Sequence, residues 1–200
     1  MRFTVLFTIV MSLLFIFSAW QLNPLCLYLS FPTLAILFLY SYTKRFTSLS
    51  HIVLGFAIGC APLAAWLAIN GEFAWTPVLL SAAVMFWVAG FDVIYSLQDI
   101  DFDRKANLFS FPSRFGPAAA LKISALFHAA TVVLLIATGT LSDSGWLVYA
   151  GIAIVSGILV WEHRIVKPHD LSRINVAFFN LNGYVSILLL LMFAGDILSK

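Results

Sequence analysis

Long apolar runs recur along the whole chain, and they constrain its fold more than any other feature. A helix needs about 20 apolar residues to cross the hydrocarbon core of a bilayer, and runs of about this length repeat with short polar breaks between them. They lie at approximately residues 3–20, 24–41, 51–69, 77–97, 117–138, 145–162 and 174–195. Because backbone amides in lipid must bond within their own segment, each run should be a helix. The sequence therefore predicts an all-α, polytopic transmembrane bundle of about seven helices.

Composition supports a membrane protein with no separate soluble part. Only 10% of the 200 residues are charged and 62% are hydrophobic, whereas about a quarter of the residues of a soluble domain are charged. We therefore expect residues 1–200 to form a single transmembrane domain. The formal net charge is only +2 and the basic residues are dispersed over short loops, which argues against a nucleic-acid partner. Cys26 and Cys60 lie inside apolar runs without zinc or redox spacing, so we interpret them as small buried hydrophobes.

The distribution of basic residues predicts the orientation of the bundle. Lys and Arg favour the cytoplasmic side of short loops. Seven crossings place ten of the 11 basic residues on one side and leave only Lys200 on the other. An added or lost crossing would scramble this segregation. We therefore expect a multi-pass protein whose N-terminus and longest loop, about residues 98–116, are cytoplasmic.

The end of the fourth apolar run carries a dense group of acidic residues. The sequence there reads AGFDVIYSLQDIDFDRKANLFSFPSRFG, which places Asp92, Asp99, Asp101 and Asp103 at or just beyond the membrane surface. A helix that continued through this segment would bring Tyr95 and three of the carboxylates onto one face, with only Asp101 directed elsewhere. Like charges clustered near lipid are unfavourable, and Mg²⁺ typically binds one or two carboxylates together with substrate phosphates. The segment therefore suggests a magnesium site that holds a diphosphate.

Simpler interpretations of the acidic segment stay open. The run DIDFDRK can be a solvated loop in which Arg104 and Lys105 neutralise the carboxylates. Asp92 lies two turns inside the helix, where an ionisable residue indicates a functional site by default. It can equally be a hydrogen-bonded structural aspartate that faces the bundle.

A transporter or other ion-binding membrane protein is the main alternative class. Such a protein would also use intramembrane carboxylates, and it predicts inverted repeats or helices broken by Gly and Pro. The stretch GCAP, which runs from Gly59 to Pro62, could break the third crossing. Convincing repeats are not evident in the sequence.

These segments together resemble the UbiA-type intramembrane prenyltransferases, especially the 4-hydroxybenzoate polyprenyltransferases and their relatives in quinone pathways. The second aspartate-rich motif of that family, DxxxD, has its counterpart in Asp99 and Asp103. The FSFPSRFG that follows has Ser110, Pro112 and Gly116 where the family has them. The stretch YSYTKRFT resembles the basic loop after the family's fourth helix, and KPHDLSRINVAFFNLNGYVSI resembles its last loop and helix. The resemblance covers nearly the whole chain.

The family normally has nine helices and a first aspartate motif, NDxxDxxxD, after its second helix. Counted from the matched motifs, the seven runs correspond to family helices three to nine. We therefore expect a chain that lacks the first two helices and half of the metal site. An inactive truncated homologue, or a non-catalytic assembly subunit, stays open as an alternative to an active enzyme.

The resemblance implies an enzyme that transfers a polyprenyl group from an isoprenyl diphosphate to an aromatic acceptor such as 4-hydroxybenzoate, in quinone biosynthesis. It makes Asp99 and Asp103 candidate Mg²⁺ ligands, where the ion would neutralise the leaving diphosphate. Asp92 matches a further family aspartate and is a candidate catalytic residue, as a metal ligand or as a group that orients the acceptor. The resemblance and the short loops favour the bacterial inner membrane, so the expected partners are the two substrates and the lipid bilayer.

Basic and aromatic residues on the same membrane face are candidates for substrate binding. Lys44 and Arg45 could bind phosphate oxygens, although they can also be plain positive-inside anchors. Arg104 and Lys105 lie beside the aspartate motif and could do the same. Tyr95 could line the path of an allylic cation, since aromatic faces attract positive charge.

The histidines and the last basic loop give no clear site. His163 and His169 flank that loop together with Glu162 and Asp170, and such irregular spacing is typical of solvated polar residues. His128 lies inside a crossing, where a hydrogen-bonded structural histidine is the default. We therefore expect no metal site at these residues.

Overall fold

The computed structural model describes residues 2–199, and these residues are almost entirely helical. The only pairing of β type in this range is an isolated bridge between Lys167 and Asp170. The helices are α1 (Arg2–Leu22), α2 (Pro24–Thr43), α3 (Ser50–Gly59), α4 (Ala61–Asn70), α5 (Trp75–Tyr95), η1 (Ser96–Asp99), α6 (Ile100–Lys105), α7 (Phe111–Phe115), α8 (Pro117–Leu141), α9 (Trp146–Ile165), η2 (Val176–Leu181) and α10 (Asn182–Leu198).

Within residues 2–199, seven helical segments are long and apolar enough to cross a membrane. They are Arg2–Leu22, Pro24–Thr43, Ser50–Asn70, Trp75–Lys105, Pro117–Leu141, Trp146–Ile165 and Val176–Leu198. Each one contains or closely overlaps an apolar run predicted from the sequence. The all-α, seven-helix, multi-pass architecture is therefore confirmed.

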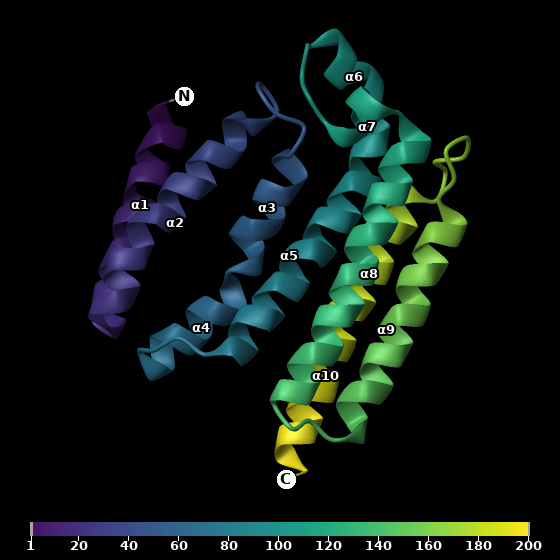
Figure 1. Ribbon diagram of the computed structural model, residues 1–200. Coiled ribbons are helices and arrows are strands. Elements are labelled where there is room, and N and C mark those ends of the chain that lie inside the picture. The colour runs from purple at the N-terminus through teal and green to yellow at the C-terminus, as the bar shows by residue number, and fades with distance from the viewer. Residues whose placement is uncertain (1, 200) are drawn as a thin grey trace.

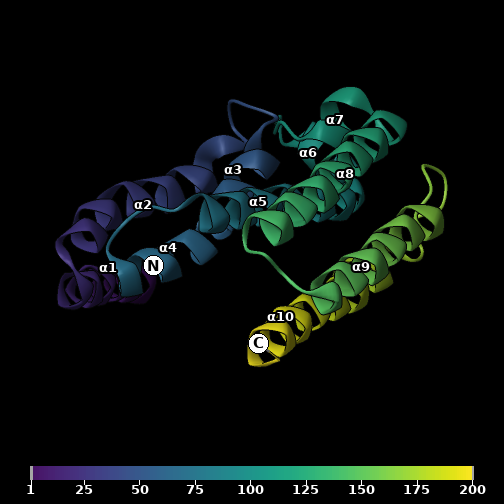
Figure 2. The same ribbon diagram turned by 60° about the horizontal axis from the view of Figure 1, so that its bottom comes forward.

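Helix α5 is the centre of the bundle (Figure 1). It packs between α3 and α8, α1 and α2 form an outer pair, and α9 and α10 lie side by side beyond α8, as a second view also shows (Figure 2). The N-terminus, the α2–α3 turn, α6, α7 and the loop after α9 share one end of the bundle, and the C-terminus lies at the other. We call the first of these the motif end, because the aspartate-rich segment lies there.

The third crossing is broken in its middle, as the GCAP stretch suggested. Helix α3 ends at Gly59 and α4 begins at Ala61, with Pro62 in its first turn. Proline interrupts the regular hydrogen bonds of a helix, and the backbone N–H of Leu63 instead donates to Ser81 Oγ on α5 at 3.0 Å. Beside the break, a Cβ at Gly59 would lie 2.8 Å from Cα of Met85. The glycine therefore allows α3 to approach the backbone of α5 closely.

The fourth crossing does not continue as one regular helix through the acidic segment. Helix α5 ends at Tyr95, the 3₁₀ turn η1 follows, and α6 resumes α-helical geometry at Ile100. Because a 3₁₀ turn has about 3.0 residues per turn, it rotates α6 relative to α5. Asp103 is buried, whereas Asp101 is exposed and Asp99 is partly exposed.

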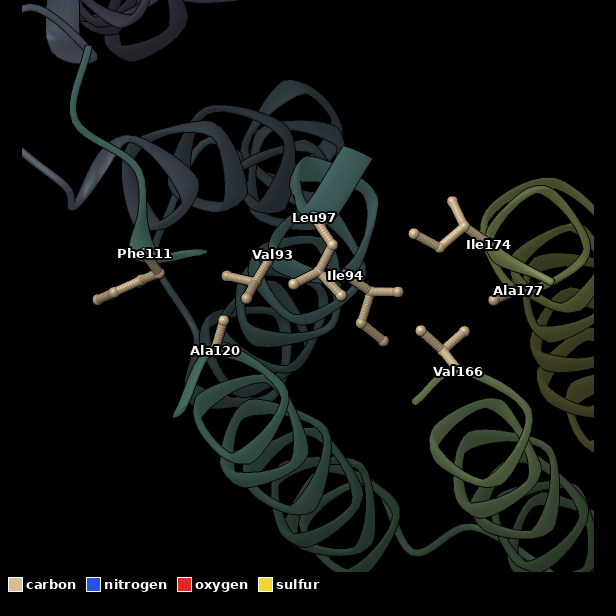
Figure 3. Close-up of a cluster of buried hydrophobic side chains, with 8 residues drawn as sticks. All are labelled: Val93, Ile94, Leu97, Phe111, Ala120, Val166, Ile174 and Ala177. Carbon is tan, nitrogen blue, oxygen red and sulfur yellow. The ribbon is translucent and has the colours of Figure 1, made fainter. Parts of the chain in front are cut away.

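A buried apolar cluster holds the motif end together (Figure 3). Its members come from α5, η1, α7, α8, the chain after α9 and the start of the last crossing. They are Val93, Ile94, Leu97, Phe111, Ala120, Val166, Ile174 and Ala177. The cluster fixes the positions from which the polar side chains of the motif end project.

Candidate functional site

Lys44 and Asp103 form an ion pair where the end of α2 meets α6. The Lys44 Nζ atom lies 3.4 Å from Asp103 Oδ2, although the two residues are 59 positions apart in sequence. The Asp103 side chain is only 2% exposed, whereas that of Lys44 is 32% exposed. The backbone adds a second link, since Phe109 N–H donates to the Lys44 carbonyl at 2.7 Å. The structure therefore brings together a predicted phosphate-binding residue and a predicted metal ligand.

An open cavity of about 320 Å³ lies beside this ion pair. It is lined by Tyr40, Ser41, Lys44, Arg45 and Leu108. Two cationic residues and two residues with hydroxyl groups thus line the same space, and Asp103 is paired with Lys44 beside it. Such a lining suits an anion with several oxygen atoms. We call this space the Lys44 pocket.

Asp92 is paired with His51, which the sequence analysis did not single out. His51 Nδ1 lies 2.6 Å from Asp92 Oδ2. The backbone N–H of Phe111 donates to His51 Nε2 at 3.4 Å, and the His51 and Phe111 rings stack at 5.6 Å between centroids. Because Nε2 accepts a hydrogen bond, the proton resides on Nδ1 and is donated to Asp92. His51 therefore connects α3, α5 and α7 and fixes the orientation of the Asp92 carboxylate.

The sequence gives only a partial signal for this pair, namely that both residues lie at the same end of their crossings. His51 is the second residue of α3, and Asp92 lies one turn before the end of α5. Consecutive crossings run in opposite directions, so both positions are near the motif end. The contact also requires the close approach of α3 to α5, which hydropathy alone does not predict.

The SFPSRFG segment owes its pattern to helix capping. Ser110 Oγ accepts from Ser113 N–H at 3.2 Å, and Ser113 Oγ accepts from Ser110 N–H at 2.9 Å. This reciprocal capping box, with Pro112 in the first turn, starts α7 and is a recognised initiation signal. It holds the Phe111 N–H in position for His51.

The remaining predicted charges lie farther outside. Lys105 and Asp101 are exposed, and Asp99 is partly exposed. Arg104 is exposed as well, and its Nε atom donates to the Ser113 carbonyl at 3.3 Å. The structure therefore gives Arg104 a local backbone partner and does not bring it or Lys105 into the lining of the Lys44 pocket.

Tyr95 belongs to an aromatic group between α5 and η2. Its ring centroid lies 4.1 Å from that of Phe178 and 6.3 Å from that of Phe179. Phe91, one turn earlier on α5, meets the edge of Phe178. The π-helical turn η2 places the two adjacent phenylalanines against α5, and such turns frequently occur at functional sites.

The carboxylates suit a metal ion only when a ligand shares it. Within residues 2–199, no three His, Cys, Asp or Glu side chains are grouped so as to hold a metal ion. Asp99 ends η1 and Asp103 lies four residues later in α6, and Mg²⁺ typically takes one or two carboxylates from a protein when it also binds phosphates. The number and type of these donors suit an Mg²⁺ that is bound jointly with a diphosphate.

We expected the polar residues around the last basic loop to be solvated, and this expectation is wrong for Glu162. Its side chain is completely buried, because it faces α8 and α10 rather than the loop. His169 and Asp170 do lie at or near the surface, where hydrogen bonds from Ser172 hold the pKa of the Asp170 carboxyl below its usual value. Spacing along the sequence did not distinguish these two environments.

Comparison with known proteins gives consistent matches. Residues 1–184 match the UbiA prenyltransferase family. The chain is 31% identical over 183 residues to the 4-hydroxybenzoate octaprenyltransferase of Klebsiella pneumoniae, and 31% identical over 194 residues to that of Tolumonas auensis. The alignments cover 92% and 97% of this chain but 63% and 66% of the two relatives. The chain thus spans slightly less than two thirds of their length.

Solved structures show the same architecture. The apo structure of a UbiA homolog from Aeropyrum pernix K1 superposes with a TM-score of 0.82 at 34% identity, over 93% of this chain and 69% of the other. A structure of digeranylgeranylglyceryl phosphate synthase superposes with a TM-score of 0.79 at 17% identity, over 97% of this chain and 69% of the other. The second match concerns the fold alone.

Proposed function

Since the chain belongs to the UbiA prenyltransferase family, we propose that it binds an isoprenyl diphosphate at the motif end and transfers the isoprenyl group to an aromatic acceptor. The names of the relatives support a polyprenyl donor and 4-hydroxybenzoate as the acceptor, which would place the reaction in quinone biosynthesis. The proposal treats residues 1–200 as one domain. The observation that carries it is the Lys44 pocket, which combines anion-binding groups with a buried carboxylate.

The diphosphate would occupy the Lys44 pocket. Lys44 offers a compact ammonium group and Arg45 a planar fork, and both are suited to phosphate oxygens. The Lys44 side chain is partly exposed, so its ammonium can contact a ligand while it stays close to Asp103. The hydroxyl groups of Tyr40 and Ser41 provide neutral donors at the same cavity.

We propose Mg²⁺ as the metal, with Asp99 and Asp103 as its protein ligands. Bound Mg²⁺ would supply Lewis-acid neutralisation of the diphosphate as it leaves with the electron pair of the allylic carbon–oxygen bond. The residues themselves bind and orient the donor, and Lys44 and Arg45 stabilise the negative charge that grows on the leaving group. The aromatic ring is then the nucleophile and loses a proton, so no side-chain nucleophile is required.

Asp92 is the proposed catalytic group for the acceptor. His51 occupies one of its oxygen atoms, which leaves the other free to accept a hydrogen bond from the acceptor hydroxyl. Tyr95, one turn later, presents an aromatic ring toward η2 and would stabilise positive charge on the isoprenyl carbon. Arg104 and Lys105 would contribute only to the positive potential around the pocket.

The break between α3 and α4 does not favour a transporter. Transporters use broken helices to direct helix ends and polar groups at an ion or substrate. Here the freed Leu63 N–H is satisfied by Ser81, and residues 52–71 contain no acidic or basic side chain. The polar chemistry lies instead at the motif end.

The orientation and location follow from the same proposal. Lys and Arg within residues 2–199 gather at the motif end, which includes the N-terminus (Figure 1). The positive-inside rule would then place that end in the cytoplasm. The matched relatives are bacterial proteins, which supports the bacterial inner membrane as the location.

Binding of an isoprenyl diphosphate to the purified full chain in detergent micelles tests the proposal. Lys44→Ala should weaken binding by about 10- to 100-fold, because a charge-assisted hydrogen bond to phosphate is lost. Lys167→Ala is the matched control, since Lys167 is exposed at the same end but lies outside the pocket, and it should bind like the wild type. Equal affinities of the two variants would refute the proposed location of the diphosphate.

A further inference from the structure

A second polar cluster lies inside the bundle, apart from the Lys44 pocket. It joins His128 on α8 to Glu162 and His163 on α9. His128 Nδ1 lies 2.9 Å from His163 Nε2 and 3.7 Å from Glu162 Oε2. The proposed prenyl transfer uses none of these side chains. We call the three residues the His–Glu cluster.

The cluster is almost completely removed from solvent. The Glu162 side chain is 0% exposed and that of His128 is 3% exposed. Both carboxylate oxygens of Glu162 and the Nε2 atom of His128 make no hydrogen bond of good geometry in the described part of the chain, and their nearest polar neighbours are Asn182 and the Trp87 backbone. Three unpartnered polar atoms in one place are unusual, because buried polar groups in native proteins are nearly always hydrogen-bonded.

Neighbouring helices cannot neutralise Glu162. Asn182 on α10 lies next to it, but its amide group donates to the carbonyls of Ala177 and Phe178 at 3.2 and 3.1 Å. The Asn182 carbonyl accepts from Trp87 Nε1 on α5 at 2.9 Å. Neither Trp87 nor Asn182 titrates, so the charge of the region depends on the His–Glu cluster alone.

The position of His128 is fixed by its packing. A Cβ at Gly90 on α5 would overlap Cδ2 and Nε2 of His128, so the glycine leaves the space that the imidazole occupies. Ser124, one turn earlier, donates to the Gly90 carbonyl at 2.7 Å. Helix α8 is therefore held against α5 with His128 directed at Glu162 and His163.

We propose that the His–Glu cluster is a proton-binding site. Glu162, His128 and His163 together hold one proton in addition to the single N–H proton of each neutral imidazole. An ionised carboxylate buried without a compensating positive charge is strongly unfavourable, and one proton on the cluster makes it neutral overall. That proton resides on Glu162 or on the His128 imidazole facing it. The site joins α8 to α9 and is separate from the proposed diphosphate site.

A proton suits the geometry better than a metal ion does. Two imidazoles and a carboxylate are a common zinc donor set, with zinc–nitrogen distances of about 2.0–2.1 Å. Tetrahedral ligands at that distance are about 3.3 Å apart. The observed nitrogen–nitrogen distance of 2.9 Å is instead that of a hydrogen bond in which the N–H of one ring donates to the other ring.

The proposal fixes how stability should depend on pH. Above about pH 7 the unfolded chain has an ionised Glu162 and neutral histidines, so the folded cluster binds one proton more than the unfolded one. Between pH 7 and 8 this difference lowers the equilibrium constant for folding about sixfold, because the unfolded histidines still bind part of a proton at pH 7. Below about pH 6 the two unfolded histidines bind two protons against one in the fold, so stability also decreases in acid.

Comparison of Glu162→Gln with Glu72→Gln tests the proposal. Both substitutions replace a carboxylate by an amide, but Glu72 is exposed between α4 and α5. Equilibrium unfolding of the full chain in mixed micelles would be measured from pH 7 to 8. Over this range the equilibrium constant for folding of the wild type and of Glu72→Gln should decrease about tenfold relative to that of Glu162→Gln, which has no carboxyl proton to lose. The same pH dependence in all three proteins would overturn the proposal.

Spectroscopy on the folded wild type provides a test that does not require Glu162→Gln to fold. At pH 8, infrared spectra of the carboxyl group and nitrogen NMR of labelled histidine should together show either a protonated Glu162 carboxyl group or one doubly protonated imidazole. An ionised Glu162 beside two neutral histidines would contradict the proposal. Stoichiometric Zn²⁺ binding that releases this proton would also contradict it, because the ligand would then be a metal.

Discussion

Two aspartates of the acidic segment are each held by a basic side chain from a preceding crossing, yet their environments differ. Asp92 is paired with His51 at 2.6 Å, and the imidazole is sealed between α3, α5 and α7. Asp103 is paired with Lys44 at 3.4 Å, and the lysine borders an open cavity. The short sealed pair fixes a carboxylate in place, whereas the longer open pair leaves a cation available to a ligand. We therefore assign positioning to the first pair and diphosphate binding to the second.

The largest expected effect comes from Asp103→Asn, which removes a proposed metal ligand but keeps the size of the side chain. The Mg²⁺-dependent gain in diphosphate affinity should decrease about 10- to 100-fold, because a charged ligand becomes a neutral one. Affinity without Mg²⁺ should not decrease, since the variant removes a negative charge beside Lys44. Titration calorimetry with and without Mg²⁺ measures both quantities.

Asp101→Asn is the matched control for Asp103→Asn. Asp101 lies two residues away and is exposed, so its removal should leave the Mg²⁺-dependent gain unchanged. If both variants lost the gain equally, general negative charge at the motif end would explain it, and the specific role of Asp103 would be wrong.

His51→Ala should affect stability rather than diphosphate binding. It leaves Asp92 and the Phe111 N–H without their partner, which should cost about 1–3 kcal/mol of unfolding free energy. His51→Gln keeps a donor and an acceptor and should recover part of this loss. Affinity for the diphosphate should stay within about threefold in both variants, as checked by parallel unfolding and binding measurements. A tenfold loss of affinity at unchanged stability would show that the sealed pair also contacts the ligand.

Arg45→Ala should weaken diphosphate binding much less than Lys44→Ala does. Arg45 is exposed, and its guanidinium lies 5.4 Å from the Tyr42 ring centroid. An exposed charge typically contributes less than about 1 kcal/mol, so we expect a loss of at most about fivefold that disappears at high salt. Arg164→Ala, an exposed arginine at the end of α9, is the control. A loss larger than that of Lys44→Ala would reverse the proposed roles of the two cations.

The helices and the acidic segment could be predicted from the sequence because both depend on local information. Hydropathy reports the length of each crossing, so all seven were found, and Pro62 indicated the break after Gly59. The DxxxD and SFPS patterns are contiguous in the chain, so they could be recognised without a structure. The cavity beside Lys44 could not be foreseen, since Tyr40 and Leu108 come from distant segments.

The two histidine contacts could not be predicted because they depend on helix rotation and spacing. Membrane helices are apolar on all sides, so the pattern of residues does not show which face meets a neighbour. His51 reaches Asp92 because Gly59 allows α3 close to α5, and His128 reaches Glu162 because Gly90 leaves room for its ring. The roles of these glycines become evident only when the neighbouring helix is known.

Binding of an isoprenyl diphosphate compared with the corresponding isoprenyl alcohol tests the central claim most directly. Both ligands offer the same apolar chain to the purified protein, and only the first has a diphosphate group for the Lys44 pocket. We predict that the diphosphate binds at least about tenfold more tightly in the presence of Mg²⁺, since it gains charge-assisted contacts, and that inorganic pyrophosphate competes with it. Equal affinities for the two ligands, with no effect of Mg²⁺ or pyrophosphate, would contradict the account.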